Sequence, residues 1–200
     1  LHPNKKSGGA SNKKMNLNRM LNSKKKAILE KWFDAVIENY HQDTAKFLKS
    51  HEDQFTNLVG SITYQGLENL LNEILNNPDE EKITKYLDDI IRIRAVQGFL
   101  PSEALYFIYR LKFIVREELA EEIKKGNLNS DLEKFDYEID KLILTAFDIF
   151  MKCREKIYDL KANELRNMTL KLIERANRIF ELKYKKTNNS LNDLLERGEI

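Results

Sequence analysis

The sequence predicts an all-α protein, a bundle of helices whose last element is one long helix. The 200 residues include 7 glycines and 3 prolines, and 33% of them are charged. Turn-rich β proteins need more glycine and proline than this. Apolar residues recur at intervals of three and four, and no segment alternates between polar and apolar residues as a half-buried strand does. We therefore expect helices and no sheet.

Three helices are predicted in the first part of the chain. They cover residues 17–40, 44–49 and 55–76. The first begins near Leu17 or Ser23, and Asp43 is expected to cap the short second one. Gly60 and Gly66 lie inside the third helix, where each costs about 1 kcal/mol relative to alanine. A close helix crossing, or room for a ligand, would explain that cost.

Two further helices meet at a corner formed by residues 98–102, of sequence GFLPS. Glycine is common just after a helix and proline in a first helical turn. The helix before the corner begins at Asp79 or Glu80, and the helix after it covers residues 101–125. This second helix is apolar nearly all round between residues 105 and 115. A helix without a polar face is normally central to a fold.

The last helix begins at Ser130 or Asp131 and continues without proline or glycine to about residue 185. Its apolar positions shift in phase near residues 161–164, which is a stutter in the repeat. We expect the first half to belong to the domain core, and the second half to project and pair with its own copy in a coiled coil. The apolar residues expected along this dimer or linker helix are Ile143, Phe150, Ile157, Leu165, Leu172 and Ile179.

The formal net charge of +2 comes from the first 14 residues, which contain four lysines and no acidic residue. The chain has 34 basic and 32 acidic side chains, so the rest of it carries two more acidic than basic ones. That mildly acidic part has no electrostatic reason to bind nucleic acid. The polar leader is expected to be disordered, and a vector remnant before Met15 would explain it. We divide the chain into this leader (1–14), a helical domain (15–160), a linker or coiled-coil helix (161–185) and a frayed tail (186–200).

The sequence also favours a cytoplasmic protein. A single cysteine, Cys153, suits a reducing compartment. The longest apolar run, residues 105–115, is interrupted by Arg110 and Lys112 and is far shorter than the roughly 20 residues of a membrane span. We therefore expect no membrane insertion.

Residue types that carry chemistry are sparse. The helix pattern invites comparison with globins, but His2, His41 and His51 all lie away from the two central helices, so a histidine ligand for haem is not expected. The carboxylates of residues 117–122 lack the Glu-x-x-His motif of di-iron bundles. No phosphate-binding loop, metal-binding cysteine pair or nucleophile motif is present. We expect no enzyme, cofactor or metal site.

Arg94 and Gln97 fall on the expected buried face of the helix before the corner. An unpaired buried polar group costs about 1–3 kcal/mol, so both side chains need partners. In one interpretation Arg94 pairs with Glu103, and Gln97 caps backbone groups at the corner. In the other, they belong to a ligand pocket that aromatic residues line. The residues of this candidate pocket or polar network are Arg94, Gln97, Ser102, Glu103, Tyr106 and Tyr109, with Phe107 among the aromatic residues.

Four segments carry a family resemblance. They are ILEKWFDAVIENY (28–40), DTAKFL (43–48), QFTNLVG (54–60) and IIRIRAVQGFLPSEAL (90–105). In this order they resemble the RsbRD N-terminal domain family, the sensor-like domains of the RsbR co-antagonist proteins of bacterial stressosomes. The resemblance covers about residues 15–160, and the corner pattern RxRAVQxFxPS is its most specific part.

The resemblance implies a globin-like helical bundle without haem, a homodimer, and a non-enzymatic sensory or regulatory role. The signal would pass along the C-terminal linker helix to a downstream protein or output domain. In full RsbR proteins a STAS domain follows the linker, and we expect no such β/α domain after residue 185. Two alternatives remain: a protein-binding scaffold without a small ligand, and a globin that binds an unknown small ligand or gas.

Overall fold

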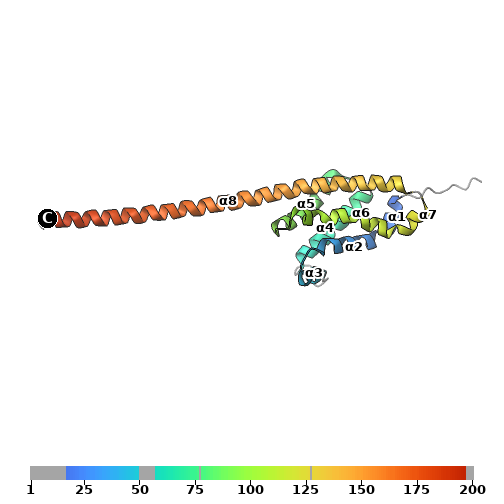
Figure 1. Ribbon diagram of the computed structural model, residues 1–200, viewed down its shortest axis with the longest axis horizontal. Helices are drawn as coiled ribbons and strands as arrows, with labels where there is room; N and C mark the ends of the chain where they lie inside the picture. Colours follow the sequence, from blue (N-terminus) through green and yellow to red (C-terminus); the bar gives the residue numbers. More distant parts are fainter. Residues whose placement is uncertain (1–16, 50–56, 77, 127, 197–200) are drawn as a thin grey trace, which may run out of the picture. The chain divides into compact units, whose positions relative to one another are not determined.

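The protein, seen in a computed structural model, is helical throughout the part that the structure describes (Figure 1). That part comprises residues 17–49, 57–76, 78–126 and 128–196. Its helices are α1 (Leu17–Ser23), α2 (Lys25–Ile37), α3 (Gln42–Lys49), α4 (Leu58–Leu75), α5 (Glu80–Val96), α6 (Pro101–Glu118), α7 (Ala120–Lys125) and α8 (Asn129–Glu196). The all-α prediction is confirmed. The predicted leader lies outside the described residues.

The chain divides into two compact units, and the division falls between Cys153 and Arg154. The first unit contains α1–α7 and the first part of α8, and the second contains the rest of α8. The boundary that we predict after residue 160 stays a prediction.

Two of the predicted helices are each broken at a single residue. The first separates into α1 and α2 at Lys24, and the helix after the corner separates into α6 and α7 at Leu119. The two breaks are joined, because the Lys24 ammonium binds the Glu118 carbonyl and lies 3.0 Å from the Glu122 carboxylate. A one-residue break leaves the spacing of apolar residues nearly unchanged, so the sequence pattern does not reveal it.

The predicted helix starts are correct at α5 and wrong at α3. The Asp79 carboxylate caps α5 by accepting hydrogen bonds from the Glu81 and Lys82 amides at 3.1 and 3.3 Å. Helix α3 already begins at Gln42, so Asp43 lies in its first turn and does not cap it. An acidic residue at either position stabilises the helix, because both positions are near the positive end of the helix dipole.

The centre of the first unit lies where α2 packs against α4 and α6. Trp32 of α2 is fully buried, and its ring lies 6.1 Å from that of Phe107 in α6. The indole N–H donates a hydrogen bond to the Phe107 carbonyl at 2.9 Å, so this buried polar atom is satisfied. This hydrogen bond ties the α2 side chain to the backbone of α6.

The first part of α8 belongs to the same core, as predicted from its apolar pattern. Its buried residues are Leu132, Phe135, Ile139, Leu142, Ala146, Ile149 and Phe150. Two ion pairs connect it to α6. Lys112 lies 2.6 Å from Asp140, and Arg116 forms a two-pronged pair with Asp136. Apolar burial and these ion pairs together hold α8 on the first unit.

The two glycines of α4 mark close helix packing. A Cβ atom added at Gly60 would lie 2.6 Å from the Leu48 carbonyl oxygen at the end of α3. The same atom would lie 2.5 Å from the side chain of Asn57, which donates a hydrogen bond to that carbonyl at 2.9 Å. At Gly66 the added atom would lie 3.1 Å from the flexible end of Ile90 in α5. Of the two explanations offered by the sequence, the structure supports close packing.

We predict that Gly60→Ala destabilises the protein by about 1–3 kcal/mol, because a backbone carbonyl and a bonded side chain must both move. Gly66→Ala is the matched control. Its methyl group meets a side chain that can shift, and alanine favours the helix by about 1 kcal/mol, so the net change should be within about 1 kcal/mol. Urea unfolding of both variants measures the difference. Equal stability of the two variants would contradict the packing assigned to Gly60.

Candidate functional site: the Arg94 corner and helix α8

The corner between α5 and α6 forms as its residues predict. Gly98 follows α5 with a φ of 86°, in the left-handed region that favours glycine. Pro101 is the first residue of α6. The Glu103 carboxylate accepts a hydrogen bond from the Leu100 amide at 2.9 Å, which closes the start of the helix. The corner therefore has a fixed geometry that places the residues around it.

Arg94 joins three helices at this corner. Its side chain is 1% exposed. One terminal nitrogen donates to the Val36 carbonyl near the end of α2, and the other donates to the Glu103 carbonyl in α6, both at 2.9 Å. Arg94 therefore contacts Glu103 through the backbone, and the pairing with the Glu103 carboxylate that the sequence suggests is wrong. The reason is that this carboxylate is already bonded to the Leu100 amide.

Aromatic rings surround the Arg94 guanidinium. Its central carbon lies 4.3 Å from the ring centre of Phe99, 5.6 Å from that of Tyr40 and 5.8 Å from that of Phe107. Cation–π contacts of this kind stabilise a charge that lacks water. Burial lowers the pKa of Arg94, and Tyr40 and Glu103 partly oppose that change. Its Nε atom is buried without a hydrogen-bond partner among the described residues.

Tyr40 and Gln97 close the corner on its outer side. The Tyr40 hydroxyl donates to the Gln97 side-chain oxygen at 2.6 Å, and the Tyr40 ring packs edge-on against Phe99 at 5.0 Å. Gln97 is exposed, so its predicted place on a buried face is wrong. It follows the last residue of α5 with its backbone still in helical conformation, and its side chain bonds Tyr40 at the surface. Burial raises the pKa of Tyr40.

The remaining predicted pocket residues do not join Arg94. Ser102 is exposed, and Tyr106 and Tyr109 are 40% and 46% exposed. Tyr109 packs against Tyr106 and against Phe113, with ring centres 6.2 and 5.1 Å apart, on the outer face of α6. Helix α6 therefore has an exposed aromatic face, while Phe107 and Leu111 on its other side are buried in the core, as expected of a central helix.

The arrangement at Arg94 indicates a structural connection. Its two terminal nitrogens bind the backbone of other helices, and aromatic rings lie around the guanidinium. Sequence reasoning missed Tyr40, Phe99 and the Val36 carbonyl as partners. Tyr40 and Phe99 were visible as apolar positions within the family segments, but nothing in their spacing indicates contact with Arg94.

The other candidate ligand residues have ordinary surroundings. His41 has an 82% exposed side chain, and His2 and His51 lie outside the described residues. Lys31 lies 2.8 and 2.7 Å from the Glu117 and Glu118 carboxylates, so that these acids bind α2. Within the described ranges, no group of histidine, cysteine and acidic side chains is arranged to hold a metal ion.

The search for membrane spans covered the same ranges. Among the helices described there, none combines the length and the apolar character that crossing a membrane requires.

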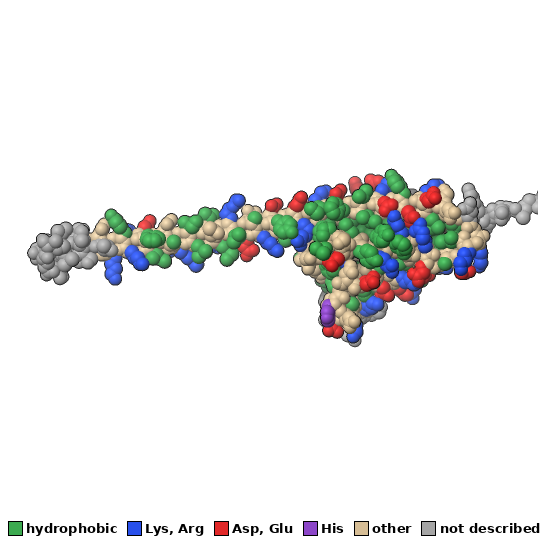
Figure 2. All heavy atoms as spheres, viewed as in Figure 1, with side chains coloured by type: hydrophobic (Ala, Val, Ile, Leu, Met, Phe, Trp, Pro, Cys, Tyr) green, Lys and Arg blue, Asp and Glu red, His purple; other side chains and the backbone are tan. Residues whose placement is uncertain are grey.

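The residues predicted for the dimer or linker helix fall into two groups along α8. Phe150 is buried in the core of the first unit, and Ile143 and Ile157 are half-buried. Ile157 already lies in the second unit, and the apolar side chains that follow it along that unit are exposed. Leu165, Leu172 and Ile179 are 66%, 62% and 55% exposed. Figure 2 shows hydrophobic side chains recurring along this helix between charged ones.

We predict that Arg94→Met destabilises the protein by about 2–4 kcal/mol, because the buried Val36 carbonyl and the partly buried Glu103 carbonyl each lose a charged donor. Arg94→Lys should not restore the stability, since an ammonium cannot reproduce the planar fork of donors. The control is Arg92→Met. Arg92 is exposed and pairs with Asp88 one helical turn away, so its loss should cost less than about 0.5 kcal/mol. A stable Arg94→Met protein in urea unfolding would contradict a structural role.

Tyr40 should make stability depend on pH in the alkaline range. Its folded pKa is raised above the ordinary value of 10.0, so the unfolded chain loses the proton first. The stability that this group contributes is complete below about pH 10 and falls as pH rises toward the folded pKa. Tyr40→Phe should reduce the loss of unfolding free energy between pH 8 and 10.5, whereas Tyr137→Phe, at an exposed position, should leave it unchanged. An identical pH dependence in both variants would contradict this assignment.

Comparison with known proteins supplies the identity of the domain. The family model described as the RsbT co-antagonist protein rsbRD N-terminal domain matches residues 26–165. An uncharacterized protein of Archaeoglobus fulgidus is 28% identical over 146 residues, which are 70% of this chain and 83% of that relative. No solved structure matches the chain. The match spans both the Arg94 corner and the start of the second unit, and it confirms the resemblance in the sequence. The chain belongs to the family of RsbT co-antagonist protein rsbRD N-terminal domains.

Proposed function

We propose that this chain is a non-enzymatic regulatory domain that forms a homodimer and passes a signal through α8 to a downstream protein or output domain. Membership of a stressosome-type regulatory family supports the regulatory role, and with it a cytoplasmic location. One observation carries the more specific proposal. Helix α8 buries one apolar face in the core of the first unit and exposes an apolar row in the second.

The exposed row has the spacing of a coiled-coil seam. Leu165, Leu172 and Ile179 are seven residues apart. Met168 and Leu182 lie three residues after Leu165 and Ile179 on the same side, and Arg175 holds the corresponding position after Leu172. The five apolar residues are at least 55% exposed. In a heptad repeat, apolar residues at such positions face a second helix. A second copy of the chain, presenting the same row, would cover this surface.

A second apolar row supports a downstream partner. Leu170, Ile173, Phe180 and Tyr184 are 51%, 51%, 71% and 70% exposed. At 100° per residue they lie on a different side of the helix from the Leu172 row. A two-stranded pairing through Leu172 would leave them accessible. This surface is large and apolar enough to receive another helix of a partner or output domain.

The dimer can be tested with two aspartate variants. At micromolar concentration, light scattering should give twice the 23.6 kDa mass of the chain. Leu172→Asp places a charge in the proposed seam and should shift the protein toward monomer. Asn167→Asp introduces the same charge on another side of the helix and should leave the dimer intact. A wild-type monomer, or equal effects of both variants, would overturn the proposed dimer.

A scaffold that binds a protein and no small ligand is the second candidate. The exposed aromatic row of Tyr106, Tyr109 and Phe113 on α6 favours it, because aromatic side chains are enriched at protein interfaces. The two functions differ in whether a small ligand enters the first unit. A cavity for such a ligand would have to lie away from Arg94, whose terminal nitrogens are bonded to backbone carbonyls.

A further inference from the structure

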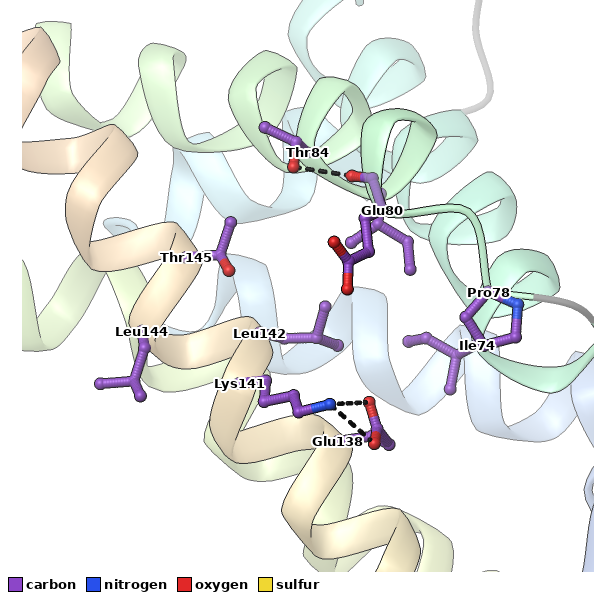
Figure 3. Close-up of a pocket in the computed structure, with 10 residues that line it drawn as sticks. Ile74, Pro78, Glu80, Thr84, Glu138, Lys141, Leu142, Leu144 and Thr145 are labelled. Atoms are coloured by element: carbon purple, nitrogen blue, oxygen red, sulfur yellow. Dashed lines mark hydrogen bonds and ion pairs between the residues drawn. The ribbon is translucent and has the colours of Figure 1, made fainter.

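A cavity of about 400 Å³ lies in the first unit, where the start of α5 faces α8 (Figure 3). This volume falls within the range of small-molecule sites, roughly 300–1,000 Å³. The residues around it come from the end of α4, the loop before α5, the first turns of α5 and α8. In the sequence they are separated by more than fifty positions, so no local motif indicates the site.

One part of the cavity wall is apolar. Ile74 and Leu142 flank the space from opposite sides, as Figure 3 shows. Ile83, which is 9% exposed, completes the inner wall, and Pro78 lies at the edge. A ligand with an apolar body would therefore displace water from a largely apolar surface.

Charge at the cavity favours a cation. Glu80 points its carboxylate into the space, and Glu138 lies at one end, 3.1 Å from the Lys141 ammonium (Figure 3). The lining residues thus include two carboxylates and one ammonium. Both acids raise the pKa of Lys141, so both act on the same small region. The lining carries an excess negative charge.

The start of α5 does not offer a site for an anion. The amides of Glu81 and Lys82 are already bonded to the Asp79 carboxylate, as described above, and Glu80 and Glu81 are acidic residues in the first turn. Thr84 donates its hydroxyl to the Glu80 carbonyl at 2.7 Å. An anionic ligand would meet carboxylates here, whereas an ammonium group would be attracted by them.

We propose that this cavity binds an organic cation, a protonated amine with an apolar body. The ammonium group lies beside the Glu80 carboxylate, Glu138 keeps its ion pair with Lys141, and the apolar body contacts Ile74, Ile83 and Leu142. The ligand would thus bridge α5 and α8. This inference rests on the proposed function in one respect: α8 is the helix through which occupancy of the cavity would be passed on.

The experiment compares two probes that share an indole body and differ in charge. Calorimetric titration of the full chain with tryptamine should show saturable binding of one molecule per chain. Indole-3-propionate, which carries a carboxylate, should bind at least about fivefold more weakly, because its charge is repelled. Equal affinity for the two probes, or no saturable binding of tryptamine at millimolar concentration, would overturn the proposal.

Variants locate the binding site. Glu80→Gln should weaken tryptamine binding about fivefold, whereas Glu81→Gln, in the same helical turn but outside the lining, should change it less than about twofold. Thr145→Phe fills the cavity and should abolish binding. Tryptamine affinity that is unchanged by both Glu80→Gln and Thr145→Phe would place the probe elsewhere and overturn the site.

A separate variant tests the cavity independently of the proposed dimer. Leu172 lies in the second unit, outside the cavity lining. Leu172→Asp should therefore bind tryptamine with unchanged affinity whatever its oligomeric state. Retained binding in a monomeric protein supports the cavity even where the dimer fails. Loss of binding in that variant would overturn the assignment to this single-chain site.

Discussion

The buried Arg94 guanidinium is the interaction on which the first unit depends. A charge removed from water must find strong partners, and Arg94 finds them in the Val36 and Glu103 carbonyls and in the face of Phe99. Those groups belong to α2, α6 and the corner between α5 and α6. The requirement therefore fixes three parts of the bundle at once.

Given this fixed corner, α8 can serve two purposes along its length. Its first part is held on the bundle by buried residues such as Phe150 and by the Lys112–Asp140 pair. Its second part exposes rows of apolar residues that suit other helices. The proposed cavity contacts the first part through Glu138 and Leu142. A ligand there would thus contact the same helix that is proposed to form the dimer and to bind the downstream partner. No other element would be needed to pass on the signal.

Sequence reasoning succeeded where a pattern is local. The helical spacing, the Gly98 turn and the apolar face of α8 are each encoded within a few turns of chain, and the structure agrees with them. It failed where the deciding contact is distant. Lys24 and Glu118 meet across 94 positions to join two helix breaks that leave the apolar spacing intact. Gln97 was placed on a buried face by helical periodicity, although it lies just after the helix ends. The sequence did not predict the cavity, because the residues that line it are distant in the chain and meet only in the folded protein.

The central claim is that α8 of one chain pairs with α8 of a second through the Leu172 row. Disulfide trapping tests it most directly. In a Cys153→Ser background, Leu172→Cys should form a disulfide-linked dimer under mild oxidation, because equivalent positions of a parallel seam bring two thiols within bonding distance. Asn167→Cys, on another side of the same helix, should remain monomeric under denaturing conditions. Failure of position 172 to cross-link, or equal cross-linking at position 167, would contradict the account.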